Sequence, residues 1–312
     1  MSASRFVVGL SLGQLTAGTD VDIAALLDVA RTAESSGIGF LLVEDSYGDE
    51  TSQTTLDPIA VTSFLGASTT SIGVVATVQP LYLEPFDIGE ALATSDFDTL
   101  GRTGWLPVRP SAAAHANLFD RPVTEDPDEI DAEIDEFIGV TQRLFDGWED
   151  GAVIRDIESG RYLDVAKLHR IDHHGRSIRV RGPLVTPRSP QGRVPTFLRT
   201  SSQRAGTDAD SAEVLIAPLG DSTEIAAAVG ATPVLAQLDS EEIHATIDTV
   251  ASLRRQGYVS GVLIRPMSGA ALRGLLAHTW GDVGAAGTLR EMFGLSRPDS
   301  IYAVGTFTEV MS

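Results

Sequence analysis

The sequence contains no cysteine and a single lysine, Lys167, among its 312 residues. Without cysteine the chain can form no disulfide, thiolate nucleophile, zinc–thiolate site or iron–sulfur cluster. Long apolar runs are absent as well, and no segment approaches the roughly 20 residues that span a bilayer. The opening residues MSASRFVVGLSLG are too few and too mixed for a signal peptide. We therefore expect a cytoplasmic protein without a membrane partner.

Basic residues are scarce along the whole chain. There are 23 Lys and Arg against 43 Asp and Glu, which gives a net charge of −20. This charge would repel nucleic acids and anionic membranes at long range, and the arginines are scattered rather than clustered. The composition, 43% hydrophobic and 21% charged, is typical of a folded globular protein. We expect a small-molecule ligand and no nucleic acid partner.

Apolar runs alternate with amphipathic stretches along most of the chain. The expected strands are Phe6–Leu12, Phe40–Val43, Ile72–Val78, a run within Thr103–Val108, Thr196–Leu198, Glu213–Ala217, Thr232–Leu238 and Gly261–Ile264. Continuous apolar runs are typical of strands that are covered on both faces. Eight such units predict an α/β fold, a (β/α)8 TIM barrel. An open doubly wound sheet is the alternative, but no GxGxxG follows any of these strands.

Two helices carry sequence signals at their ends. The helix after the first strand is expected to be capped by Thr19 or Asp20 and to end at Gly37. The helix after the seventh strand is expected to begin with a capping box made by Asp239 and Glu242. Both helices belong to the alternating pattern that predicts the barrel.

The alternation breaks between the fourth and fifth strands. Arg109–Pro127 is polar and contains prolines, an acidic helix follows it, and Gly151–Arg193 consists of short pieces typical of hairpins. We expect one domain, residues 1–312, with an insertion at about 109–193. Within it, HRIDHHGR holds three histidines and Asp172, but their spacing is irregular for metal ligands, so we expect no metal site.

Barrel enzymes carry their reactive groups on the loops that follow the carboxyl ends of the strands. Around these ends the sequence has Asp45 after the second strand, Thr77 in the third and Trp105 in the fourth. Asp45 can hold a ligand hydroxyl or ring N–H, or it is an ordinary turn residue. Trp105 can stack on a planar ligand, or it belongs to the core. The other candidates are Glu44, Gln79, Tyr82, Arg109, Arg199, Asp221, Gln237 and Arg265.

The clearest physical signal is the pair Ser201 and Ser202 after the fifth strand. Hydroxyls and free backbone N–H groups at a helix start can bind an anion, and Arg199 or Arg204 can add positive charge. The alternative is a simple helix cap, which serine often provides. No Walker motif, GxSxG elbow or HExxH helix occurs, so hydrolysis by a serine triad or by zinc has no support. The residues alone indicate an acidic barrel with a candidate site for a phosphate-bearing ligand.

Four segments resemble the bacterial luciferase-like flavin monooxygenases, in the branch that contains nitrilotriacetate and dibenzothiophene-sulfone monooxygenases. VATVQPLYLEPFDIGEALATSDFDTLGRTGW is similar to the branch pattern VATxSTTYxEPYxxAR…LDxLSxGRxGWN. FLLVEDSYG resembles FDxxFxADxxG, and LREMFGLSRP resembles LRExLGLxRP. The longest match is LFDGWEDGAVIRDIESGRYLDVAKLHRIDHHGRSIRVRGPLVTPRSPQG, which is similar to the branch's insertion and has its specific RGPL…PRxPQG ending.

The resemblance implies a TIM barrel that binds FMN at the carboxyl ends of its strands. In such enzymes a separate reductase supplies reduced FMN, which reacts with oxygen so that a small organic substrate is oxygenated. By motif position, Asp45 and Thr77 match residues that contact the isoalloxazine ring, and Trp105 is a further candidate for this site. Ser201 or Ser202 matches the serine that holds the FMN phosphate. A homodimer is the usual state of the family.

The chain departs from the branch at several of these positions. Leu106 stands where the branch has a flavin-contacting asparagine, and Gln79 stands at the serine of STT. The phosphate motif QAGxS reads LRTSS, so Thr200 replaces its glycine. No aromatic residue within Glu129–Asp131 matches the tyrosine of ERY. Each change removes a hydrogen bond or reshapes the pocket, at a cost of about 1–3 kcal/mol.

We therefore expect an FMN-dependent two-component monooxygenase in a shortened form, with a flavin reductase as partner. Two alternatives stay open. An F420-dependent oxidoreductase would transfer hydride in the same barrel, and a non-catalytic barrel would have lost flavin binding and would serve as a binding or subunit protein. None of the six histidines occupies a position that we can assign to catalysis, so the catalytic residues are unknown.

Overall fold

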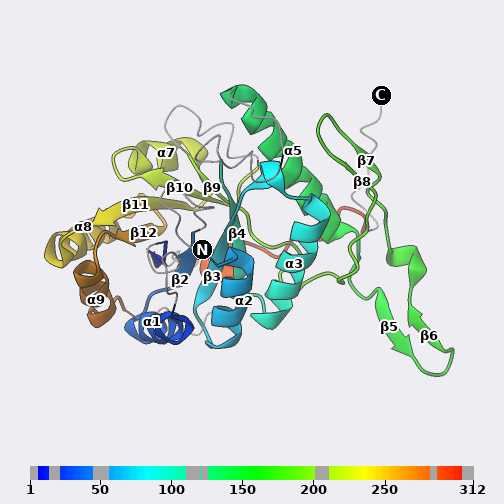
Figure 1. The fold of residues 1–312 in the computed structure, drawn as a ribbon, viewed down its shortest axis with the longest axis horizontal. Helices are drawn as coiled ribbons and strands as arrows, with labels where there is room; N and C mark the ends of the chain where they lie inside the picture. Colours follow the sequence, from blue (N-terminus) through cyan, green and yellow to red (C-terminus); the bar gives the residue numbers. More distant parts are fainter. Residues whose placement is uncertain are drawn as a thin grey trace.

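Eight parallel strands form a nearly closed barrel at the centre of the structure (Figure 1). The computed structural model describes residues 6–13, 22–44, 56–109, 120, 126–200, 211–281 and 287–303. The strand order is β4-β3-β2-β1-β12-β11-β10-β9. A parallel bridge joins Trp105 of β4 to Thr196 beside β9. The backbone N–H of Trp105 donates to the Pro195 carbonyl at 3.1 Å. This contact brings the two outer strands together and confirms the predicted TIM barrel.

The barrel strands are short runs of mostly buried residues. Their bounds are β1 (Val7–Ser11), β2 (Phe40–Val43), β3 (Gly73–Val78), β4 (Thr103–Pro107), β9 (Phe197–Arg199), β10 (Val214–Pro218), β11 (Val234–Ser240) and β12 (Gly261–Pro266). Each lies on a predicted run and differs from it only at the ends. The continuous apolar pattern arises because the lumen covers one face of each strand and the helices cover the other.

Helices surround the barrel between its strands (Figure 1). The helices of the described residues are α1 (Ile23–Ser36), α2 (Pro58–Ala67), α3 (Pro85–Asp98), α5 (Pro127–Asp146), α7 (Ser222–Val229), α8 (Ile243–Gln256), α9 (Gly269–Ala277) and the short α10 (Leu289–Met292), and the 3-10 turns are η1 (Pro80–Tyr82) and η2 (Val165–Lys167). The predicted acidic helix, α5, packs against α3. Within the described ranges no helix is long and apolar enough to cross a membrane.

The predicted start of α1 is wrong, and its predicted end is confirmed. The helix is capped by Asp22, whose carboxylate accepts two backbone N–H groups at 2.9 and 3.2 Å. Thr19 and Asp20, the predicted caps, lie outside the described residues. Gly37 ends the helix with φ 86°, in the left-handed region where a side chain would be strained. Three acceptable capping residues stood close together in the sequence, and the pattern did not distinguish them.

The capping box predicted for α8 is also wrong. Asp239 lies in β11 and its carboxylate forms an ion pair with Arg265 at 2.7 Å, so it does not reach the helix. Glu242 is the residue before the helix and makes no side-chain cap. The strand ends at Ser240, two residues later than predicted, so Asp239 belongs to the strand and not to a cap.

Apolar side chains fill the barrel interior at the amino ends of the strands. The inward residues of the strands form one cluster with Leu289, Met292 and Phe293, which come from α10 and the residue after it. The rings of Phe40, Phe197 and Phe293 lie 5.5 to 5.8 Å apart, centre to centre. The interior is therefore solid below the carboxyl ends. We call the packed rings of Phe40, Phe197 and Phe293 the plug, and the sequence pattern did not predict it.

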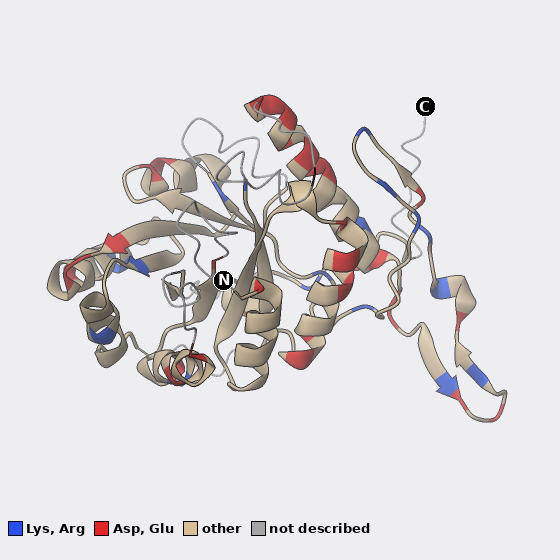
Figure 2. Cartoon of the chain, in the orientation of Figure 1, with Lys and Arg blue, Asp and Glu red and all other residues tan. Residues whose placement is uncertain are grey.

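Two β-hairpins follow α5 outside the barrel (Figure 1). β5 (Val153–Asp156) pairs with β6 (Arg161–Leu163), and β7 (His173–His174) pairs with β8 (Arg179–Val180). Figure 2 shows acidic residues along α5 and basic residues on these hairpins. The hairpins agree with the prediction for this part of the insertion.

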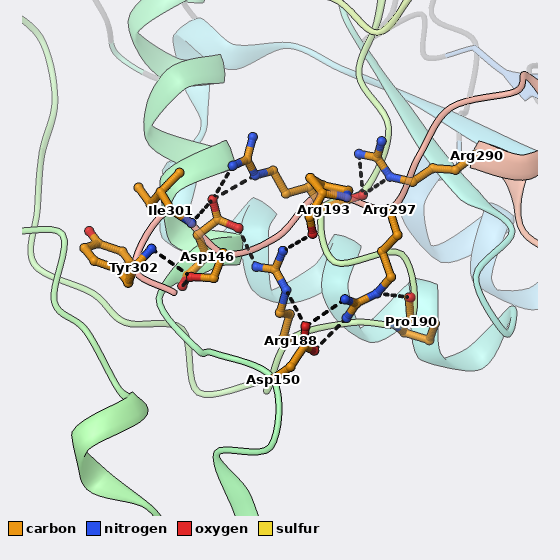
Figure 3. A network of polar contacts seen from close by, with 11 residues as sticks. Asp146, Asp150, Arg188, Pro190, Arg193, Arg290, Arg297, Ile301 and Tyr302 are labelled. Carbon is orange, nitrogen blue, oxygen red and sulfur yellow. Dashed lines mark hydrogen bonds and ion pairs between the residues drawn. The ribbon is translucent and has the colours of Figure 1, made fainter. Parts of the chain in front are cut away.

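An ionic network with a buried centre at Asp146 and Arg188 connects the end of α5 to the end of the insertion (Figure 3). Asp146, at the end of α5, is fully buried and forms ion pairs with Arg188 and, at 2.6 Å, with Arg193. Arg297 donates to both oxygens of Asp150 at 2.7 Å, and these bonds hold the pKa of Asp150 below its usual value. Carboxylates can be buried at low cost only when they are paired in this way.

The PRxPQG ending of the insertion also connects the insertion to the barrel, through the hydrogen bonds of Gln191. Gln191 donates from Nε2 to Asp96 Oδ1 at 2.6 Å and to the Thr103 carbonyl at 2.7 Å. Its Oε1 accepts the backbone N–H of Arg290 at 3.0 Å. Burial raises the pKa of Asp96, although the hydrogen bonds that it accepts oppose this. The motif therefore has a structural role in this chain, since it ties the insertion to α3, β4 and α10.

Candidate functional site

Polar side chains face inward where the barrel strands end. Side chains alternate between the two faces of a strand, and Leu42, Phe197 and Leu263 belong to the interior cluster. The residue two positions further along each of these strands is charged and lies at the carboxyl end. We call the inward polar residues at this level the mouth layer: Ser11, Glu44, Thr77, Arg199, Gln237, Asp239 and Arg265.

A chain of polar contacts crosses the mouth layer. Ser11 Oγ donates to Glu44 Oε2 at 2.5 Å. The other carboxylate oxygen of Glu44 forms an ion pair with Arg199 Nη2, and Arg199 Nε donates to Gln237 Oε1 at 3.4 Å. These residues come from β1, the end of β2, β9 and β11. The contacts therefore connect strands from both halves of the chain across the opening of the barrel.

Arg265 and Asp239 form a second pair at the same level. Arg265 donates from Nε and Nη2 to the two oxygens of Asp239 at 2.8 and 2.7 Å. The Arg265 bonds lower the pKa of Asp239, and Asp239 in turn raises the pKa of Arg265, with a smaller contribution from Glu44. The mouth layer thus holds two carboxylates and two guanidinium groups, whose formal charges balance.

Two polar side chains at and just after the end of β3 are almost completely buried. Thr77 is 3% exposed, and its Oγ1 donates to the Val43 carbonyl at 3.3 Å. Gln79 is also 3% exposed. Its Oε1 is buried and accepts no hydrogen bond in the described part of the chain. A buried acceptor without a donor is rare in native structures, so this atom is unusual.

A cleft opens beside the mouth layer, between the ends of β4 and β9 and the start of α5. Its volume is about 290 Å³. The lining residues are Pro107, Val108, Arg109, Asp131, Ile134, Asp135, Leu198 and Arg199. Arg109 and Asp131 form an ion pair at its edge. Because Arg199 belongs both to the cleft and to the mouth layer, a ligand in the cleft would lie next to one at the mouth.

The structure describes two of the five predicted site residues. Thr77 lies in the mouth layer, as expected for a ligand contact. Trp105 is fully buried and packs against Phe137 of α5, with ring centres 6.4 Å apart, so the core alternative describes its place. Asp45, Ser201 and Ser202 lie outside the described residues. Their neighbours Glu44 and Arg199 are described, and these two are in contact across the mouth.

Two mouth-layer residues are not among the predicted site residues: Asp239, which was predicted to cap α8, and Ser11. The strand that holds Ser11 was predicted, and the alternation of side chains from Val7 would have placed Ser11 on the inward face. The contact from Ser11 to Glu44 was not predictable, because the two residues are 33 positions apart and meet only through strand pairing.

Two of the three histidines of HRIDHHGR, His169 and His173, form side-chain contacts with polar residues. His173 Nδ1 lies 3.2 Å from Arg143 Nη1 and its Nε2 lies 2.9 Å from Glu136 Oε1. Because arginine can only donate, Nδ1 is the acceptor and Nε2 carries the proton. His169 Nε2 lies 2.6 Å from Glu149. In the described ranges, no group of three or more His, Asp or Glu could hold a metal ion.

The chain matches the family model for luciferase-like monooxygenases over residues 4–258. It is 33% identical over 213 residues to nitrilotriacetate monooxygenase component A of Aminobacter aminovorans, which covers 62% of this chain and 47% of that protein. It is 34% identical over 179 residues to dibenzothiophene-sulfone monooxygenase of Rhodococcus erythropolis, covering 53% and 40%. With N-acetyl-S-(2-succino)cysteine monooxygenase of Bacillus subtilis it shares 32% identity over 195 residues, covering 60% and 44%. The match thus spans less than half of the length of each of these relatives.

Solved structures share the fold. EDTA monooxygenase from Chelativorans sp. BNC1 superposes with a TM-score of 0.80 at 15% identity, covering 94% of this chain and 99% of that one. A riboflavin lyase solved with modified FMN and riboflavin gives 0.78 at 20% identity, covering 93% and 95%. An F420-dependent secondary alcohol dehydrogenase gives 0.62 at 10% identity, covering 87% and 96%. At these identities the likeness shows the fold alone. The match over residues 4–258 shows more: this chain belongs to the luciferase-like monooxygenase family.

Proposed function

We propose that this chain is a flavin-dependent monooxygenase that uses reduced FMN and O2 to oxidise a small organic substrate. Family membership supports the reaction class. The relative named component A points to a system with a further component, so the proposal includes a separate reductase that supplies the reduced flavin. We also propose a homodimer, for which light scattering of the purified 33.0 kDa chain is the test.

The observation that carries the proposal is a polar mouth layer above a solid apolar interior. A planar ring at the mouth would meet hydrogen-bonding groups on the side that faces the barrel. The plug formed by Phe40, Phe197 and Phe293 would keep water from reaching that side through the lumen. Exclusion of water protects reactive intermediates from hydrolysis, which an oxygen-activating site requires.

The groups present at the mouth fit a flavin in their chemistry. We propose Asp45 and Thr77 for the ring, and Ser201 and Ser202 for the phosphate. The buried hydroxyl of Thr77 supports the first assignment, and the serines follow a strand end where a helix start can bind an anion. Trp105 is the least supported candidate, because it is buried in the core. When bound and reduced, FMN supplies the electrons for oxygen activation, and the chain holds and shields it.

The cleft beside the mouth is the proposed substrate site. Its 290 Å³ is close to the lower end of the range for ligand pockets, about 300–1,000 Å³, which supports a small substrate. Val108, Ile134 and Leu198 offer apolar surface, and the Arg109–Asp131 pair offers polar groups at the edge. A substrate with an apolar body and one polar group would suit this lining.

One observation favours a second candidate function, a non-catalytic barrel. The Glu44–Arg199 ion pair lies across the mouth, at the level where a flavin ring would approach. If that pair closes the site, the chain would serve as a binding or subunit protein. An F420-dependent reaction is a further alternative at the same mouth, since a solved F420 enzyme shares the fold.

Anaerobic titration with FMN, first oxidised and then reduced, tests the proposal. Flavin fluorescence reports binding, and F420 is titrated in parallel. We expect saturable binding of reduced FMN in the micromolar range, about −8 kcal/mol. Binding of F420 alone would replace the monooxygenase with the F420 alternative. Failure of FMN in both states and of F420 would contradict flavin chemistry and support the non-catalytic barrel.

A further inference from the structure

Gln79 directly follows β3 and continues its inward face, two residues beyond Thr77. Along this strand Val75 belongs to the interior cluster, whereas Val74 and Val78 belong to the cluster between the barrel and the helices. Gln79 keeps extended backbone angles, φ −103° and ψ 94°, so the alternation continues to it. Its side chain therefore faces the same side as Thr77, at the mouth of the barrel.

The side-chain amide of Gln79 is buried, and its oxygen accepts no hydrogen bond from any described residue. The side chain is 3% exposed, and Oε1 has no donor within reach. Leaving a buried acceptor unsatisfied is unfavourable, and native chains keep such atoms mainly where a ligand or water completes them. A primary amide presents an acceptor and a donor side by side. Its best complement is a ligand edge with an N–H next to a carbonyl.

We propose that Gln79 binds the pyrimidine edge of the flavin, with Oε1 accepting the ring N3–H and Nε2 donating to an adjacent ring carbonyl. This inference rests on the proposed function and deepens it by naming a residue for one edge of the cofactor. The isoalloxazine ring has one such imide edge, and deazaflavins share it. The branch pattern has a serine here, which can form only one of the two bonds at a time and has a shorter reach.

The proposal makes opposite predictions for binding and for stability. Gln79→Met keeps the length of the side chain and removes both polar atoms. It should weaken FMN binding about tenfold, because the imide edge loses its partner. The free protein should keep or raise its urea midpoint, because the variant removes an unsatisfied buried acceptor. A residue needed only for packing or folding would lower both.

The test compares FMN with N3-methyl-FMN, which cannot donate from N3. Wild-type protein should bind N3-methyl-FMN at least about fivefold more weakly than FMN, and Gln79→Met should bind the two equally. Gln256→Met is the matched control: Gln256 is exposed on α8, and its Nε2 donates to Ser252 Oγ at 3.2 Å. This control should retain the wild-type preference for FMN.

Each remaining result overturns the assignment in a different way. A Gln79→Met protein that still prefers FMN over N3-methyl-FMN would show that another group binds N3. A lower urea midpoint with equal losses for both flavins would assign Gln79 to packing. Wild-type protein that binds neither flavin would remove the proposed function and this inference together, a result distinct from the first two.

Discussion

Glu44 and Arg199 are 155 residues apart in the chain and form an ion pair across the mouth of the barrel. The branch patterns FDxxFxADxxG and QAGxS have alanine at both positions. A charged residue at either position alone would leave a partly buried charge without this partner, and together the two charges neutralise each other. The two departures from the family pattern therefore meet in one ion pair at the mouth.

Replacing both residues, Glu44→Ala with Arg199→Ala, should increase FMN affinity about fivefold, because no ion pair then has to be desolvated when the ring approaches. The free energy of unfolding should change by less than about 1 kcal/mol, since both side chains are partly exposed. Flavin titration and urea unfolding measure the two quantities. Glu44→Ala alone is the control and should bind FMN more weakly than the double variant. Unchanged affinity in the double variant would place the ring away from the mouth layer.

The double variant Ser201→Ala with Ser202→Ala should weaken FMN binding at least about tenfold, because charge-assisted hydrogen bonds to the phosphate are lost. Riboflavin, which has the same ring and no phosphate, should bind the variant and the wild type equally. Parallel fluorescence titrations of the two flavins provide the measurement. Equal losses for both flavins would assign the serines to the fold rather than to the phosphate.

Asp146→Asn should lower the free energy of unfolding by about 3 kcal/mol, because two arginines lose their buried carboxylate partner. Asp164→Asn is the matched control. Asp164 pairs with Arg161 at 3.4 Å on the surface, so its loss should change stability by less than about 0.5 kcal/mol. Urea unfolding of the two variants measures the difference. Similar effects would mean that the network in Figure 3 does not hold the insertion in place.

Glu34 should make stability depend on pH in the acid range. Burial alone would raise its pKa, but Oε1 accepts the N–H groups of Ser71, Thr70 and Ile72, and these bonds lower it. A lowered folded pKa stabilises the native state above the unfolded value of 4.5, and this contribution is lost as the pH falls through the folded pKa. Glu34→Gln should therefore cost about 1–2 kcal/mol at pH 7 and progressively less below pH 4.5.

Urea unfolding at several pH values measures this difference. Glu241→Gln, at an exposed position, is the control and should leave the pH profile of the wild type unchanged. A gap between Glu34→Gln and wild type that stays constant down to about pH 3 would show that Glu34 acts through packing and not through its charge.

Local sequence was enough to predict the barrel, because each strand is a short apolar run with both faces covered. Phe40–Val43 was predicted with the bounds that the structure has. The helix ends were less predictable, because several capping residues compete within one turn: Asp22 caps α1, and Asp239 belongs to a strand. Thr77 could be placed at the mouth from its position in β3 and from the family motif.

The sequence by itself determined the eight strands, the family and the candidate positions at the strand ends, since all of these follow from local patterns. Tertiary structure decided which of those positions meet. The contact between Glu44 and Arg199 exists only because the barrel closes and brings β2 and β9 to the same opening. The burial of Trp105 against Phe137 and of the unsatisfied Gln79 amide likewise depends on what packs over them. Side-chain pairing and burial arise from residues far apart in the chain, and local patterns carry no information about them.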